Sequence, residues 1–395
     1  MTNTGNPNKD KWKIRFGQIF QALLVKSGKR LEDYLYFLPS GVQPDVKTDK
    51  SFELIDLNLN KDLYNRYFGS RVMVVSNLNR QTAARLDSTL VIVPGFGHHR
   101  IKTKAFAQQM ELLENLGFHL VYAFYDDSLE SNENCANRVY DVVKSRVDEK
   151  QNIIFLTYSK GSPVVVELLS DPRYQDVAAR TRAVVSFAGA IRGSIHTSLP
   201  AARITMKLLK LYRRLSKGSG IVTNIRRKLL KWSAKLPFKS LKKWHTLVEK
   251  AVEFQDDLQE FPDGIKDLKK IQAAKNYSDA RLPDSIKLFS ISAVIPESEF
   301  KKGFKFITNA DDLFLYVSGS KLYRDNVFND TRVLLPDSEF FPGSGDIINL
   351  GIVKADHWGI ALPNVFSKNY IDPFPRTEML SAVLLTLDEY FNPSP

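Results

Sequence analysis

The sequence predicts an α/β protein with a mostly parallel central sheet, because apolar runs of strand length alternate with stretches of helical periodicity. The run 89–93 is apolar throughout, which is typical of a strand buried on both faces of a parallel sheet. The chain has 395 residues, of which 43% are hydrophobic, and can therefore bury a large core. These observations together predict a doubly wound sheet with helices on both faces.

The individual elements follow from the same patterns, taken in chain order. An antiparallel start to the sheet is expected from two early segments, 51–59 and 71–77. Further strands are expected near 89–94, 119–125, 152–158, 182–188, 285–294 and 332–335. Helices are expected near 103–116, 134–149, 161–170 and 376–390.

The segment around Ser159 has the pattern of a turn that presents a nucleophile. An apolar run, 152–156, leads into Thr157-Tyr158-Ser159-Lys160-Gly161, and a helix-like stretch follows from Pro163. A tight strand-to-helix turn lifts the serine hydroxyl above the sheet edge, and the helix directs its N–H groups at a developing oxyanion. The usual pattern is Gly-x-Ser-x-Gly, and here Thr157 replaces its first glycine. The alternative interpretation is a serine that only caps a helix after a buried strand.

A glycine-rich loop, Pro94-Gly95-Phe96-Gly97-His98-His99, follows the strand expected at 89–94. Such a loop lets backbone N–H groups approach a ligand. In an acyl-transfer enzyme the two oxyanion donors would be the N–H of Phe96, or of Gly97, and the N–H of Lys160. The Lys160 side chain is expected to be exposed and to take no part. The alternative is a plain strand-to-helix turn.

His357 is the histidine best placed to act as a general base. It lies in a loop before the last helical stretch, and of the six histidines it alone follows both the serine and the candidate acids. The order Ser, acid, His is the order that this kind of strand-turn-helix arrangement imposes. His98 and His99 are expected at a loop rim, and their adjacency does not suit two ligands on one helix face, so we expect no metal site and no cofactor.

Asp330 is the preferred acid, because an Asn-Asp turn after an extended segment can hold its carboxylate toward the histidine. Its task would be to fix the tautomer of His357 and to stabilise the imidazolium. Asp337 and Asp346 are competitors. Asp356 ranks last, because adjacent side chains in an extended segment point apart.

With these motifs the chain resembles α/β-hydrolases, and more narrowly the bacterial lipase or esterase-like members of that superfamily. The resemblance rests on Val-Pro-Gly-Phe-Gly at 93–97, Tyr-Ser-Lys-Gly at 158–161, Asn-Asp at 329–330 and Ala-Asp-His-Trp at 355–358 with a following Ala-Leu-Pro. It covers roughly 85–195 and 285–390. It implies a nucleophilic serine, an acid and a histidine at those positions.

The sequence pattern and this resemblance predict four parts of the chain. They are an N-terminal helical extension (1–45), a first part of the core (46–194), a helical cap or lid insertion (195–283) and a second part of the core (284–395). Within the insertion, the window 201–250 holds fifteen Lys or Arg residues and one acid, a net charge of +14. Since the whole chain carries +12, everything outside this window sums to −2.

The basic window alternates apolar and cationic residues at helical spacing, as in 206–215 and 221–236. One interpretation is a lid whose apolar face covers the active site. Another is a surface that docks on anionic lipid, where each basic residue contributes on the order of 1 kcal/mol. Nucleic-acid binding is a third interpretation, with Trp232 and Trp244 as aromatic contacts, but no nucleic-acid motif supports it.

The N-terminal segment is expected to be an add-on to the core, with an amphipathic helix near 12–24. It lacks the features of a signal peptide, and no run of about 18 apolar residues indicates a membrane span. The single cysteine, Cys135, is compatible with a reducing compartment. We therefore expect a cytoplasmic protein that can lie at a membrane periphery. The sequence does not fix its oligomeric state.

The function expected from these features is hydrolysis of carboxylic esters by Ser159, Asp330 and His357. A cap rich in Leu, Ile and Trp favours an acyl chain or another apolar substrate. A thioesterase or a polyester depolymerase would use the same residues. A non-catalytic protein of the same fold, binding a membrane or a partner through its basic cap, is the alternative of a different class.

Overall fold

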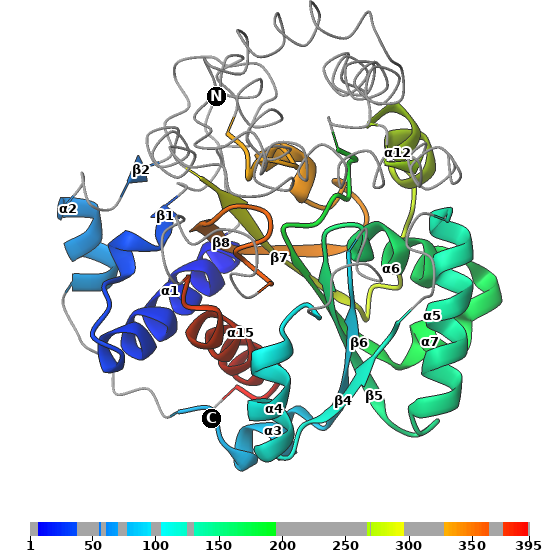
Figure 1. Ribbon diagram of the computed structural model, residues 1–395, viewed down its shortest axis with the longest axis horizontal. Helices are drawn as coiled ribbons and strands as arrows, with labels where there is room; N and C mark the ends of the chain where they lie inside the picture. Colours follow the sequence, from blue (N-terminus) through cyan, green and yellow to red (C-terminus); the bar gives the residue numbers. More distant parts are fainter. Residues whose placement is uncertain are drawn as a thin grey trace, which may run out of the picture.

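The computed structural model describes residues 7–37, 55–56, 61–69, 77–95, 104–124, 130–194, 267–268, 270–295, 328–362 and 374–393. Within these residues an eight-stranded sheet runs in the order β2-β1-β8-β7-β6-β5-β3-β4 (Figure 1). Its strands are β1 Leu35–Phe37, β2 Ile55–Asp56, β3 Ser88–Val93, β4 His119–Tyr122, β5 Asn152–Tyr158, β6 Thr181–Phe187, β7 Lys287–Val294 and β8 Asp346–Lys354. The strands from β8 through β4 pair in parallel, and β1 is antiparallel to both β8 and β2. The predicted α/β architecture is confirmed.

Helices cover both faces of the sheet (Figure 1). One face carries α1 Pro7–Lys26, α3 Arg80–Leu86, α4 Ala107–Asn115 and α15 Arg376–Phe391, and the other carries α5 Asn132–Arg146, α6 Gly161–Ser170, α7 Gln175–Arg180 and α12 Lys270–Tyr277. The shorter turns are α2 Lys61–Tyr64, a π-helical turn Asn65–Gly69, and 3₁₀ turns Leu31–Asp33, Pro172–Tyr174 and Leu335–Ser338.

Strand β3 shows why the central strands are mostly apolar rather than alternating. Leu90 and Ile92 belong to the core on the α1 and α15 side, whereas Val91 and Val93 belong to the core on the α5 and α6 side. Successive side chains of a strand point to opposite faces, so a strand covered on both faces needs apolar residues throughout.

The prediction of a strand at 332–335 is wrong. Asn329 and Leu334 form an isolated bridge, and the chain then enters the 3₁₀ turn that contains Pro336. Pro336 has no N–H to donate, so the apolar run cannot continue as an inner strand. The last strand in the chain is instead β8. Asn349 and Gly351 interrupt its apolar pattern, so the sequence pattern did not predict it.

The early strands were expected in part. Ile55–Asp56 forms β2 inside the segment 51–59, but the strand that joins the early chain to β8 is β1, which was not expected. Residues 71–76 of the other expected early strand, 71–77, lie outside the described residues.

Most of the predicted insertion, 195–283, also lies outside the described residues, including the whole basic window 201–250. The structure describes only 267–268 and 270–283 of it. Within that part, Ala273 and Tyr277 of α12 join the core on the α5 and α6 side.

Helix α1 is part of the core, contrary to the expectation that the N-terminal segment is an add-on. Phe16, Ile19 and Phe20 have no exposed surface, and α1 packs against both α15 and β8. Arg15 also forms an ion pair with Glu389 of α15. The amphipathic pattern alone could not tell a helix at the surface from one that closes a face of the sheet.

We predict that Phe20→Ala destabilises the protein by about 3–5 kcal/mol, because it removes a fully buried ring and leaves a cavity. The ring also stacks on Phe16, with centroids 5.7 Å apart. Chemical denaturation monitored by circular dichroism measures the change. Val25→Ala, on the same helix at a residue 49% exposed, is the matched control and should change stability by less than about 0.5 kcal/mol. Equal stabilities of the two variants would show that α1 is an appendage.

Candidate active site

Ser159 lies on the sharp turn between β5 and α6, in a backbone conformation that few L-residues adopt. Its φ is +53°, in the left-handed region. Three backbone hydrogen bonds hold the turn: the N–H of Ser159 donates to Phe187, and the carbonyl of Ser159 accepts from Ser162 and Ala190, at 3.0–3.2 Å. A strained serine fixed in this way at the carboxyl end of a central strand is the geometry predicted from the sequence.

Two glycines let the end of β3 pass close to this turn. A Cβ on Gly161 would lie 2.3 Å from the carbonyl oxygen of Val93, and a Cβ on Gly95 would lie 2.8 Å from the Cβ of Ser159. Neither contact is sterically possible, so both positions require glycine. The loop after β3 therefore starts against Ser159. Its continuation, with the predicted oxyanion donors Phe96 or Gly97 and with His98 and His99, lies outside the described residues.

Thr157 stands where the usual pattern has glycine, and the structure accommodates it by hydrogen bonding. Its side chain is fully buried, and its hydroxyl lies 2.8 Å from that of Ser162, which in turn lies 2.8 Å from that of Ser186. Thr157 also donates to the carbonyl oxygen of Val185 at 3.3 Å. A buried hydroxyl costs little free energy when it is hydrogen bonded, so threonine is compatible with the turn.

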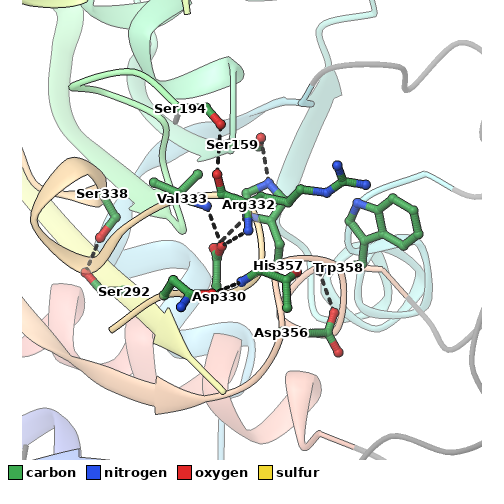
Figure 2. A network of polar contacts seen from close by, with 12 residues as sticks. Ser159, Ser194, Ser292, Asp330, Arg332, Val333, Ser338, Asp356, His357 and Trp358 are labelled. Carbon is green, nitrogen blue, oxygen red and sulfur yellow. Dashed lines mark hydrogen bonds and ion pairs between the residues drawn. The ribbon is translucent and has the colours of Figure 1, made fainter. Parts of the chain in front are cut away.

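The structure brings His357 to Ser159. The Nε2 of His357 lies 2.8 Å from the Oγ of Ser159, and its Nδ1 lies 2.6 Å from the Oδ2 of Asp330 (Figure 2). All three side chains are buried. When Nδ1–H donates to the carboxylate, Nε2 is left as the acceptor for the serine proton, which is the arrangement that a general base needs.

The turn 329–333 orients the carboxylate of Asp330. Its Oδ1 accepts the backbone N–H groups of Arg332 and Val333 at 2.8 and 2.7 Å, which leaves Oδ2 toward the histidine. The N–H of His357 donates to the carbonyl oxygen of Asp330 at 2.7 Å, so the two loops are also joined through their backbones. Thr331, which lies between Asp330 and Arg332 in the turn, has a φ of +84°, in the left-handed region. An Asx turn of this kind fixes a carboxylate without help from a distant element.

The competing acids lie elsewhere. Asp346 begins β8 and lies 3.4 Å from Lys287, at the opposite end of that strand from His357. Asp337 belongs to the 3₁₀ turn Leu335–Ser338. Asp356 accepts the N–H groups of Trp358 and Gly359, each at 2.9 Å, and its burial raises the pKa of its carboxyl. Of the candidate acids, Asp330 is therefore the one whose carboxylate is hydrogen bonded to the imidazole of His357.

Tyr158 is a site residue that the sequence reading did not single out. Its hydroxyl donates to the carbonyl oxygen of His357 at 2.7 Å, and its ring centroid lies 5.2 Å from the imidazole centroid. Burial is the main cause that raises the pKa of this phenol well above its usual value, so it remains a donor at neutral pH. The residue before the serine thus supports the loop that carries the histidine. The only signal in the sequence is an aromatic residue inside the turn.

Lys160 is not exposed, contrary to the expectation from the sequence. Its side chain has no accessible surface, and its Nζ donates to the carbonyl oxygen of Glu130 at 2.5 Å and lies 3.7 Å from the Sγ of Cys135. The start of α6 points this side chain inward, toward α5. The backbone N–H of Lys160, the second predicted oxyanion donor, directly follows Ser159 in the turn.

The remaining histidines do not join the site within the described residues. His119 is exposed at the start of β4, and His196 and His245 lie outside the described residues. Nowhere in the described part of the chain do three or more His, Cys, Asp or Glu side chains gather as metal ligands would. A search of the same residues for a helix with the length and hydropathy of a bilayer span finds none.

Comparisons with known proteins agree at the level of fold. No protein-family model matches the chain, and no curated protein matches its sequence. Among solved structures, the chain is similar to the metagenomic carboxyl esterase MGS0156, with a TM-score of 0.56 and 20% identity over 95% of this chain and 91% of that one.

Weaker likenesses are to EstA from Clostridium botulinum and to lipase 1 from Pelosinus fermentans. Their TM-scores are 0.46 and 0.45, with 11% and 13% identity. The alignments cover 81% of this chain and 89% of EstA, and 75% of this chain and 98% of the lipase. The parallel sheet, the serine turn between β5 and α6 and the likeness to the esterase show that the chain has the α/β-hydrolase fold.

Proposed function

We propose that this protein is a serine hydrolase of carboxylic esters, in which Ser159 is the nucleophile, His357 the general base and Asp330 the acid that orients it. The observation that carries the proposal is the continuous set of contacts from Asp330 Oδ2 through His357 to Ser159 Oγ, at 2.6 and 2.8 Å. A hydroxyl hydrogen bonded to a base, with the base oriented by a third group, is the arrangement of an activated nucleophile.

The reaction proceeds in two acyl transfers. His357 accepts the proton of Ser159 as its oxygen attacks the ester carbonyl, and Asp330 stabilises the imidazolium that forms. The backbone N–H groups of Lys160 and of Phe96, or Gly97, bind the oxyanion. The imidazolium then protonates the leaving alcohol, and a water molecule repeats the sequence on the acyl-enzyme.

Acyl or other lipid esters are the substrates that we propose, because the insertion at 195–283 is rich in Leu, Ile and Trp. The +14 charge of the window 201–250 suits a surface with anionic lipid, so we propose action at a membrane periphery from the cytoplasm. Thioesters or polyesters would be cleaved by the same residues. Comparison of kcat/KM for ester, thioester and polyester substrates identifies the substrate class, which is the one with the highest value.

Replacing the nucleophile or the base should abolish turnover without unfolding the protein. Ser159→Ala and His357→Ala are each expected to lower kcat for a 4-nitrophenyl ester by at least about a thousandfold, because each removes a group essential to acylation. His119→Ala is the matched control and should retain full activity, since His119 lies at the amino end of β4, whereas Ser159 follows the carboxyl end of β5, and the two strands run parallel in the sheet. Turnover by Ser159→Ala at the rate of the natural protein would contradict the assignment.

The acid is tested by exchanging carboxylates for amides. Asp330→Asn is expected to lower kcat about 10³- to 10⁴-fold, because the amide no longer favours the tautomer that the base needs. Asp346→Asn, at the other end of β8, should change kcat less than twofold. Steady-state kinetics on both purified variants, with thermal unfolding as a check of folding, measures the difference. A larger loss in Asp346→Asn than in Asp330→Asn would reverse the assignment.

A further inference from the structure

The segment that follows β6 contacts both turns of the candidate active site. Near its start, the N–H of Ala190 donates to the carbonyl oxygen of Ser159 at 3.0 Å. Further along, the Oγ of Ser194 donates to the carbonyl oxygen of Arg332 at 2.8 Å (Figure 2). Arg332 belongs to the turn that carries the proposed acid. One short segment of the chain therefore joins the turn of the nucleophile to the turn of the acid.

The hydroxyl of Ser194 binds the same peptide group that binds the carboxylate. It is the peptide group between Arg332 and Val333. Its carbonyl oxygen accepts the hydrogen bond from Ser194, and its N–H donates to the Oδ1 of Asp330 at 2.7 Å. A peptide group is planar, so its carbonyl and its N–H move together. A rotation of this plane would disturb both hydrogen bonds, and the hydroxyl of Ser194 opposes it.

Ser194 is itself held in place. Its N–H donates to the carbonyl oxygen of Leu268 at 2.7 Å, and the residue is 7% exposed. The side chains of Ala190, Leu268 and Val333 form a small buried apolar cluster, so the segment and the acid turn are also packed together. The hydroxyl is therefore presented by an anchored backbone, as a group that positions another must be.

The orientation of the Asp330 carboxylate matters most in the transition state. Its Oδ2 lies 2.6 Å from the Nδ1 of His357, and the positive charge that it stabilises exists only once the histidine accepts the serine proton. An interaction that strengthens in the transition state contributes to kcat rather than to KM. The second donor to Oδ1, the N–H of Arg332, belongs to the preceding peptide group. Loss of the Ser194 hydroxyl should therefore weaken the orientation of the carboxylate without abolishing it.

We infer that Ser194 is a positioning residue of the reaction: its hydroxyl fixes the Arg332–Val333 peptide group, whose N–H holds the carboxylate of Asp330 toward the histidine. This inference rests on the proposed function. Ser194 acts through Asp330 in this role, so its effect on catalysis exists only while residue 330 is a carboxylate.

Ser194→Ala tests the inference, because it removes the hydroxyl and little else. We expect kcat for a 4-nitrophenyl ester to fall about five- to fiftyfold, with KM changed less than about threefold. Ser88→Ala is the matched control, since Ser88 is also 7% exposed and its Oγ donates to the carbonyl oxygen of Leu86 at 2.7 Å, at the amino end of β3. Its kcat should stay within about twofold. Both variants should lower the melting temperature to a similar extent, because each removes a hydroxyl donor from a backbone carbonyl.

A double-mutant cycle separates positioning from a purely structural effect. Ser194→Ala is added to Asp330→Asn, in which the carboxylate is already absent. We expect kcat of the double variant to lie within about twofold of that of Asp330→Asn alone, because changes that act through one group are not additive. A hydroxyl that only stabilised the fold would lower kcat by the same factor in both backgrounds. If Ser194→Ala does not fold, Ser194→Cys carries the same expectations, because a thiol fills the space but is a weak donor.

The inference is overturned by an unchanged kcat in the Ser194 variant, by an equal loss of kcat in Ser88→Ala, or by an equal loss in the natural and Asp330→Asn backgrounds. Failure of the proposed function is a separate result, because the unaltered protein would then hydrolyse no ester at all. An active natural protein with an equally active Ser194 variant rejects the role of Ser194 alone.

Discussion

The left-handed conformation of Ser159 is the constraint on which the rest of the site depends. A φ of +53° turns the chain from the end of β5 directly into α6, and this places the hydroxyl beside the loop of His357. The turn is stable only because its neighbours accommodate it. Gly161 leaves room for the carbonyl oxygen of Val93 at the end of β3, and Gly95 leaves room for the Cβ of Ser159. The carbonyl of Ser159 is bound by the N–H groups of Ser162 and Ala190.

Thr157, Tyr158 and Lys160, which flank Ser159 in the chain, are buried polar residues with hydrogen-bonded side chains. Thr157 continues into a chain of serine hydroxyls, Tyr158 binds the loop of His357, and Lys160 binds the carbonyl of Glu130. Two residues before the serine and one after it thus connect the turn to three different parts of the core. A polar network of this kind fixes one arrangement, because any shift leaves a buried donor or acceptor without a partner.

The sequence was sufficient for the features that depend on local pattern. The apolar runs predicted β3, β5, β6 and β7, and the serine turn, the Asn-Asp turn and the position of His357 in the chain predicted which residues meet. These predictions succeeded because a strand buried on both faces and an Asx turn are determined by neighbouring residues.

Features that depend on tertiary contacts were missed. Strand β8 carries Asn349 and Gly351 and reads as a loop, and helix α1 reads as an appendage although it closes one face of the sheet. The burial of Lys160 contradicts the polarity of its side chain, which is the general signal for exposure. Strand β8, the packing of α1 and the burial of Lys160 each depend on which elements lie against them in the fold, so the local sequence pattern could not predict them.

The most direct test of Ser159 as a nucleophile is to expose the folded protein to a fluorophosphonate, which bonds to an activated serine. The adduct is then mapped by intact-mass and peptide mass spectrometry. We expect one adduct per chain, on Ser159, and none in His357→Ala. The experiment is run with and without anionic vesicles, so that an insertion covering the site cannot hide a reactive serine. Folded protein that gives no adduct in either condition would show that Ser159 is not an activated nucleophile, and would favour a non-catalytic protein of the same fold.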